Sequence, residues 1–152
     1  GNELHEPKGI DTAAAGSVYV ADGLDSGNWV DRFQGHFIVN SYWLGGTIPD
    51  ISTPGSHAYF AVPVKSELTS LYVIIDGALA LADPKLEIYV NGTLFPNSLT
   101  IEQTGSAAGN VFSMAVTTSN TLAAGARIEV RSDGASDNAV PAFVQVGLRA
   151  KA

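Results

Sequence analysis

Three histidines, a set of carboxylates and many hydroxyl groups are the side chains that could do chemistry. His5, His36 and His57 are scattered, and none stands at metal-ligand spacing from another histidine or an acid. The chain has no cysteine, so it can form neither a disulfide nor a thiolate metal site. No serine occupies the G-x-S-x-G turn that presents a hydrolase nucleophile. We therefore expect no metal site, no cofactor and no catalytic residue.

Paired carboxylates are the remaining catalytic arrangement, as in glycosidases, where two acids flank the bond that breaks. Most acids of this chain fall in turn segments, but Glu87 and Glu129 alternate with Lys85, Arg127 and Arg131. That alternation is typical of solvated cross-strand charge pairs, which contribute roughly 0.2–1 kcal/mol each. The sequence therefore predicts a protein that is not an enzyme.

The charge balance limits the classes of partner. The 152 residues carry a net charge of −7, and charged residues make up 15% of the chain. Because nucleic acids and anionic membrane surfaces are bound through basic patches, we expect neither as a partner. No apolar run reaches the ~18 residues of a membrane span. Gly, Ser, Thr and Asn fill many polar positions, a composition that suits packing against other protein chains.

The segment Lys85–Ile101, KLEIYVNGTLFPNSLTI, organises the elements around it. Leu86, Ile88 and Val90 alternate with polar side chains, which is the period of a half-buried strand. Asn91-Gly92 follows at once, and both residues tolerate the positive φ of a tight type I′ hairpin. We expect Pro96-Asn97 to interrupt the returning strand, because proline cannot donate to a ladder.

The remaining chain from residue 57 onward also reads as short strands. Residues 71–75 are apolar on both faces, so this strand should be central or covered by a neighbouring subunit. Pro63 predicts an edge or bulged strand, and residues 76–84 read as a short helix or a crossover loop. Phe143 falls on the outer face of the last strand, opposite Val144 and Val146. Seven or eight strands with frequent turns predict an all-β, jelly-roll-like β-sandwich; an immunoglobulin-like sandwich is the alternative.

Aromatic residues are dense ahead of this region. We expect a subunit or partner contact here, since tryptophan and tyrosine dominate interface hot spots. Two other interpretations stay open: the rings close one end of the sandwich, or they form a stacking platform for a sugar. The candidate contact residues are Trp29, Phe33, Phe37, Tyr42 and Trp43.

Residues 1–16 read as an extended arm. Pro7 and Gly9 break regular structure, and Leu4 and Ile10 are the large apolar side chains. Such a segment is either a frayed terminus or a tether that becomes ordered on a partner surface, with Leu4 and Ile10 as anchors.

The phrase HEPKG-x-D-T-A-A-A-G-x-VYVADG-x-x-SG-x-W, which runs from His5 to Trp29, resembles a module of bacteriophage virion proteins. That module heads small head-decoration or fibre proteins, ahead of an outward-facing β-domain. The order of LEIYVNGT, LAAGARIEVRSDG and AFVQVGLRA is also similar to phage jelly-roll domains. It is more loosely similar to the trimeric jelly rolls of the tumour-necrosis-factor and C1q type.

Together with the strand pattern, these resemblances imply three parts. They are an N-terminal virion-anchoring arm with a short strand at residues 1–35, an aromatic and glycine-rich connector at 36–56, in which Gly45 and Gly46 read as irregular, and a β-sandwich at 57–152. They imply a capsid decoration or head-fibre subunit on the capsid exterior. Its expected partners are the major capsid protein or another virion protein, with a homotrimer as the assembly. The alternative is a tail-fibre or carbohydrate-binding module whose partner is a host-surface glycan. The implied virion-binding residues are Leu4, His5, Glu6, Pro7, Lys8, Gly9 and Ile10.

Overall fold

The computed structural model describes residues 17–23, 26–31, 41–117 and 120–151. The chain divides into two compact units, Gly1–Val39 and Asn40–Ala152. In the first unit, β1 (Ser17–Gly23) and β2 (Ser26–Asp31) pair as an antiparallel hairpin, with Tyr19 opposite Trp29. The sequence predicted one short strand within residues 1–35, whereas the structure has two there.

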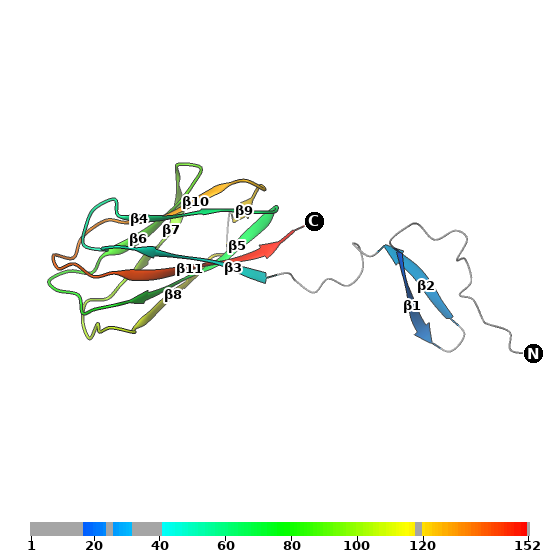
Figure 1. Ribbon diagram of the computed structural model, residues 1–152, viewed down its shortest axis with the longest axis horizontal. Helices are drawn as coiled ribbons and strands as arrows, with labels where there is room; N and C mark the ends of the chain where they lie inside the picture. The colour runs from blue at the N-terminus through cyan, green and yellow to red at the C-terminus, as the bar shows by residue number, and fades with distance from the viewer. Residues whose placement is uncertain (1–16, 24–25, 32–40, 118–119, 152) are drawn as a thin grey trace, which may run out of the picture. The chain divides into compact units, whose positions relative to one another are not determined.

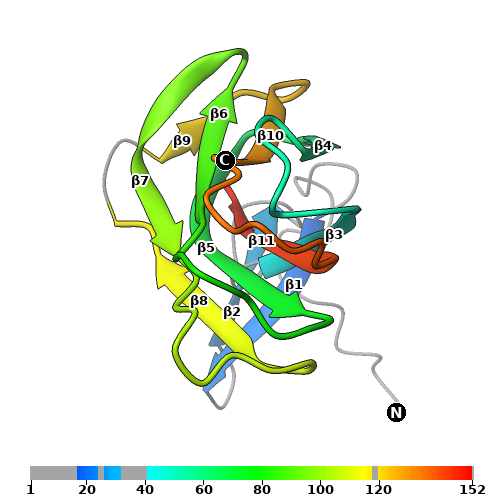
Figure 2. The same cartoon turned by 90° about the vertical axis from the view of Figure 1, so that its left-hand side faces the viewer.

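The second unit is a sandwich of two antiparallel sheets (Figures 1 and 2). One sheet has the order β3-β11-β5-β8, with the short β9 also paired to β5, and the other has the order β4-β10-β6-β7. The strands are β3 (Ser41–Ile48), β4 (His57–Ala61), β5 (Ser66–Ile75), β6 (Lys85–Val90), β7 (Thr93–Thr100), β8 (Val111–Ala115), β9 (Thr121–Leu122), β10 (Arg127–Ser132) and β11 (Ala142–Ala150).

The connections give the sandwich its topology. If β9 is set aside, each connection from β3 to β11 passes from one sheet to the other, except the hairpin between β6 and β7. This is the jelly-roll arrangement, so the expected fold class is confirmed and the immunoglobulin-like alternative is not adopted. Asn91 (φ 51°) and Gly92 (φ 86°) form the hairpin, as the sequence predicted, and both have the positive φ that a type I′ turn requires.

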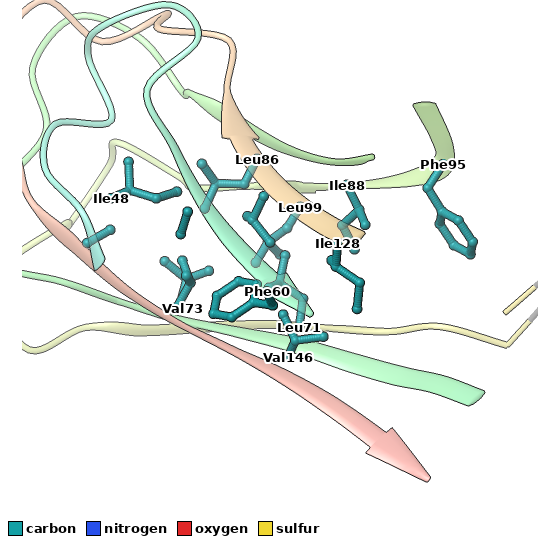
Figure 3. Packing of buried hydrophobic residues seen from close by; sticks show 14 of the residues in the cluster. Ile48, Phe60, Leu71, Val73, Leu86, Ile88, Phe95, Leu99, Ile128 and Val146 are labelled. Atoms are coloured by element: carbon teal, nitrogen blue, oxygen red, sulfur yellow. The ribbon is translucent and has the colours of Figure 1, made fainter. Parts of the chain in front are cut away.

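The core lies between the two sheets, as Figure 3 shows. Ile88 and Ile128 enter it from one sheet, and Leu71, Val73 and Val146 enter it from the other. All five are fully buried, and burying a side chain of this size contributes about 1.5–3 kcal/mol. The alternation read from the sequence is therefore correct for these strands. Residues 71–75 belong to β5, which lies between β11 and β8 and is central, as predicted.

The strand β3 belongs to the sandwich. It is an edge strand of its sheet and pairs with β11 along its whole length. The sequence interpretation had placed it in a connector over residues 36–56, because Gly45 and Gly46 read as irregular. In the sheet, these glycines allow close packing: a Cβ atom on Gly46 would lie 3.0 Å from Cε1 of Phe60. A glycine in a strand therefore marks a close approach here and not the end of the strand.

Prolines mark two of the sheet edges. The strand β4 is an edge strand, as predicted from Pro63, and it ends at Ala61. At the opposite edge, Pro96 lies within β7, where the pairing with β6 shifts register between Glu87 and Tyr89. The interruption predicted at this proline is therefore a bulge within one continuous strand. Residues 76–84 form a loop, in which Leu81 has a φ of 66°.

Asp50 fixes the loop that leads from β3 to β4. Its Oδ1 accepts hydrogen bonds from the Ser52 amide at 2.8 Å, the Ser52 hydroxyl at 2.7 Å and the Val140 amide at 3.2 Å. Its Oδ2 accepts a hydrogen bond from the Thr53 hydroxyl at 3.0 Å. These donors, the Ser52 hydroxyl foremost, lower the pKa of Asp50 below its usual value of 3.8, against the opposing effect of burial.

Candidate binding surface

The outer face of the β3-β11-β5-β8 sheet is free of charge over a central region. Strand pairing places twelve outward positions there in three rows of four, and none of them carries a charged side chain. We call this region the neutral face. Its rows are Thr47, Phe143, Ile74 and Val111; Gly45, Gln145, Tyr72 and Ser113; and Trp43, Gly147, Ser70 and Ala115.

The neutral face concentrates the exposed apolar side chains of the sandwich. Five of the nine large hydrophobic residues that are exposed in the described part of the chain lie on it. Single exposed hydrophobic residues are ordinary on protein surfaces, but a contiguous group of them is typical of an interaction site. The five residues are Trp43, Tyr72, Ile74, Val111 and Phe143, with exposed fractions between 39% and 60%.

Two glycines hold the aromatic rings close to the sheet. A Cβ atom on Gly147 would lie 2.7 Å from Cζ3 of Trp43 and would also meet the Ser70 hydroxyl, so the indole ring lies over the backbone of β11. A Cβ atom on Gly45 would lie 3.2 Å from Cζ of Phe143. Each ring thus covers a glycine on the neighbouring strand, which stabilises the strand pair and fixes the ring.

The rings of Trp43 and Tyr72 also contact each other. Their centroids are 5.4 Å apart and their planes are inclined by 74°, an edge-to-face geometry that contributes about 0.5–1.5 kcal/mol beyond burial. Because Trp43 is held by both Gly147 and Tyr72, its ring is positioned before any partner arrives.

An open hollow of about 310 Å³ adjoins one end of the neutral face. Thr47, Ile74 and Phe143 belong to both the hollow and the first row of that face. Most of the surface that lines the hollow is apolar, and Asp76 is the residue with a charged side chain among those that line it.

The rim at the other end of the neutral face carries both signs of charge. Nε of Arg149 donates a hydrogen bond to Oε2 of Glu67 at 3.1 Å, and Nζ of Lys151 lies 3.5 Å from the same oxygen. The Arg149 guanidinium is the main cause of the lowered pKa of Glu67. Acidic and basic groups therefore lie side by side at this border.

The outer face of the β4-β10-β6-β7 sheet carries charged side chains that pair with acids and aromatic rings. Nε of Arg131 donates a hydrogen bond to Oε1 of Glu129 at 2.8 Å, and this pairing raises the pKa of Arg131. The guanidinium of Arg131 also lies 4.1 Å from the centroid of the Tyr89 ring, and that of Arg127 lies 5.4 Å from the ring of Tyr59. Charged and aromatic groups are therefore already paired with each other on this face.

The sequence interpretation of Glu129 as a solvated acid was wrong. Its side chain is only 3% exposed: strand pairing places it between Tyr59 and Tyr89, and it forms an ion pair with Arg131. Its partner Arg131 lies two residues along the same strand and not on a neighbouring strand. Glu87 accepts a hydrogen bond from the Tyr89 hydroxyl at 2.8 Å, which is the main cause of the raised pKa of Tyr89.

The structure separates two of the predicted contact residues. Trp43 belongs to the neutral face, whereas Tyr42 points into the sandwich, where its hydroxyl lies 2.6 Å from the Ser66 hydroxyl. Trp29 lies on β2 in the other compact unit. Phe33 and Phe37 lie outside the described residues, as do the predicted arm residues Leu4, His5, Glu6, Pro7, Lys8, Gly9 and Ile10.

Sequence reasoning did not assemble the rest of the neutral face. Tyr72, Ile74 and Val111 were not proposed as contacts, and Phe143 was noted as an outward residue without a site. The signal was the run of residues 71–75, in which both faces are apolar although one sheet face points to solvent.

The described ranges contain no group of three or more histidine, cysteine or acidic side chains placed to hold a metal ion. Nδ1 of His57 lies 2.7 Å from the Gly55 carbonyl oxygen and 4.0 Å from Oε1 of Glu129. No helix within these ranges has the length and apolar character needed to cross a bilayer.

No protein-family model matches the chain, and no curated protein matches it in sequence. Among solved structures, the capsid of Helicobacter pylori bacteriophage KHP30 contains a similar chain at 12% identity and a TM-score of 0.49, covering 74% of this chain and 90% of that one. CsCBM6-3 from Clostridium stercorarium, solved with cellobiose, is similar at 15% identity and a TM-score of 0.43, with 74% and 87% covered.

The catalytic unit of the GH87 alpha-1,3-glucanase from Streptomyces thermodiastaticus is similar at 17% identity and a TM-score of 0.46. The match covers 74% of this chain and 25% of the glucanase chain, so this chain spans about a quarter of that protein's length. All three similarities are distant, and they assign no role to this chain.

Proposed function

We propose that this chain is a structural protein of a bacteriophage virion. It acts as a capsid decoration or head-fibre subunit that attaches to the capsid exterior through its N-terminal arm and projects the β-sandwich outward. The observation that carries the proposal is the neutral face, because a charge-free surface with fixed aromatic rings suits protein assembly. The setting in a virion comes from the resemblance of residues 5–29 to phage virion modules.

The division into two compact units supports separate tasks for the two parts of the chain. Gly1–Val39 contains the segment proposed to anchor, and Asn40–Ala152 forms the sandwich with its own buried core. In a homotrimer, three arms would engage the capsid together, and the effective concentration of the second and third arms would strengthen a weak single contact. The proposed binding partner of the arm is the major capsid protein or another virion protein.

The net charge of −7 supports an exterior location, because packaged DNA would repel an acidic protein on the inner side. We propose no catalytic role. Several carboxylates of the sandwich are engaged in structural interactions: Glu129 with Arg131, Glu67 with Arg149, and Asp50 with the loop that follows it.

The test is a deletion of residues 1–16 from the full chain, compared with a variant that keeps those residues in scrambled order. Both proteins should show the far-ultraviolet circular dichroism and unfolding temperature of the intact chain, because the sandwich has its own core. Neither should bind phage particles that lack this protein, whereas the intact chain should bind. Undiminished binding by both variants would remove the arm from the proposal, and failure of the intact chain to bind any virion component would refute the proposal itself.

A second candidate is a receptor-binding module that recognises a host-surface glycan. The observation that favours it is the pair of Trp43 and Tyr72, whose exposed rings offer a surface on which a sugar ring could stack. A glycan array probed with the full chain tests this function. Binding that Trp43→Ala abolishes and Tyr59→Ala leaves intact would support it, since Tyr59 is equally exposed on the opposite sheet at 53%.

A further inference from the structure

We infer that the partner of the neutral face is another copy of this chain. The inference deepens the proposed function, because it names what covers the surface on which that proposal rests. In an assembly of such copies, the aromatic rows of β3, β11, β5 and β8 would be buried between subunits.

The composition of the neutral face matches the centre of a permanent interface. Such centres are depleted in charged residues and enriched in aromatic ones. Here none of the twelve positions is charged, and Trp43, Tyr72 and Phe143 supply the aromatic rings. Ser113, Ser70 and Gln145 are neutral hydrogen-bonding residues between them, so burial would leave no unpaired charge.

The charge distribution favours a second copy over a different partner. The sandwich unit, residues 40–152, carries nine acidic and six basic side chains, so a basic partner would be attracted to its acidic surface and not to the neutral face. Two acidic copies repel each other least where they meet through a region without charge. The neutral face is such a region. Its rim carries Glu67 beside Arg149 and Lys151, so each charged group of one copy can face a group of opposite charge on the second.

The fixed rings reduce the cost of association. Trp43 lies over Gly147 and against Tyr72, and Phe143 lies against Gly45, so each ring has lost conformational freedom before a partner binds. On the opposite outer face, the exposed Tyr59 ring and the half-buried Tyr89 ring lie against Arg127 and Arg131, so a partner there would have to bury charged groups.

The chain offers a matched pair of substitutions as the test. Ala115 is an exposed alanine on the edge strand β8, within the neutral face, and Ala61 is an exposed alanine on the edge strand β4 of the other sheet. Ala115→Glu places a charge in the proposed interface, whereas Ala61→Glu places the same charge at an equivalent position outside it. Val111→Lys, at a side chain that is 60% exposed on the neutral face, repeats the test with the opposite sign.

Light scattering after size-exclusion chromatography and sedimentation velocity give the mass of the full chain. We would measure it at total concentrations from about 1 to about 100 µM, which covers moderate and weak affinities. The wild type and Ala61→Glu should have a mass that is a multiple of 15.8 kDa, and Ala115→Glu and Val111→Lys should have the mass of one chain. Circular dichroism checks that each variant is folded. If Ala115→Glu does not fold, the mass of the Val111→Lys variant decides the test.

A wild type that stays monomeric throughout this range overturns the inference, as does a folded Val111→Lys variant that keeps the wild-type mass. These outcomes differ from failure of the proposed function. A monomer that still attaches to virions, and loses attachment on Val111→Lys, makes a virion protein the partner of the face. An oligomer that attaches to no virion keeps the inference and refutes the virion role.

Discussion

The loop between β3 and β4 should depend on the ionised carboxylate of Asp50. Asp50→Ala removes an acceptor that holds four donors, from Ser52 (amide and hydroxyl), Thr53 and Val140, at 2.7–3.2 Å. Hydrogen bonds to a charged group are worth about 1.5–3 kcal/mol each, but in this half-buried loop most of these donors can form hydrogen bonds with water when the carboxylate is removed. We therefore expect a net loss of about 2 kcal/mol in the free energy of unfolding, or roughly 5–10 °C in Tm.

The pH dependence makes this prediction sharper. The folded-state pKa of Asp50 is lowered, so its contribution is fully present above the unfolded value of about 3.9 and is lost as the pH falls through the folded value. Thermal unfolding of the wild type and Asp50→Ala should therefore differ most near pH 7, and the difference should shrink below about pH 4. Asp50→Asn keeps the shape of the side chain and should behave at pH 7 like the protonated wild type.

The control is Asp137→Ala, which removes an exposed turn acid and should change the stability by less than about 0.5 kcal/mol. Equal unfolding temperatures for the wild type and Asp50→Ala at neutral pH would refute the assigned role of the carboxylate. A difference that stays constant from pH 7 to pH 3 would show that the carboxylate charge plays no part.

Three further changes test the sandwich itself. Leu71→Ala removes a fully buried side chain and should lower the free energy of unfolding, measured by urea titration, by about 2–5 kcal/mol. Its control, Leu94→Ala, changes a side chain that is 53% exposed and should cost less than about 1 kcal/mol. Equal losses would contradict the core assignment. Gly92→Ala forces a Cβ atom into a turn with a φ of 86° and should cost about 1–2 kcal/mol; an unchanged denaturation midpoint would exclude the type I′ turn. Glu129→Gln keeps an acceptor for Arg131 but removes a carboxylate that is only 3% exposed, so it should cost about 1–3 kcal/mol at pH 7; an unchanged stability would mean that this buried charge contributes nothing to the sheet.

The sequence carried enough information for the fold class because the alternation of apolar and polar residues is a local property of each strand. Leu86 and Ile88 in β6 were assigned to the buried face on this pattern, and both are fully buried. The Asn91-Gly92 turn was equally local. In contrast, β3 was missed because its glycines are explained by rings on other elements, Phe60 and Phe143, which the local pattern does not reveal.

The candidate surface could be predicted only in part, for a related reason. Trp43 was named from its residue type, but its neighbours Tyr72 and Phe143 reach it through the pairing of β3 with β11 and of β11 with β5. That register depends on contacts between residues about 70 and 100 positions apart in the chain, which no local period encodes. Glu129 illustrates the same limit, since the pairing that places it between Tyr59 of β4 and Tyr89 of β6 is not visible in the local pattern of β10.

The bulge at Pro96 has a consequence for copies of this chain at high concentration. A strand at the border of a sheet can accept a strand from another molecule, and long uninterrupted borders invite such growth. In β7 the proline has no amide hydrogen to offer, and the register shift beside it breaks the regular spacing of the remaining donors and acceptors. The β7 edge therefore disfavours strand pairing between neighbouring molecules, and with it the growth of a fibre at high density.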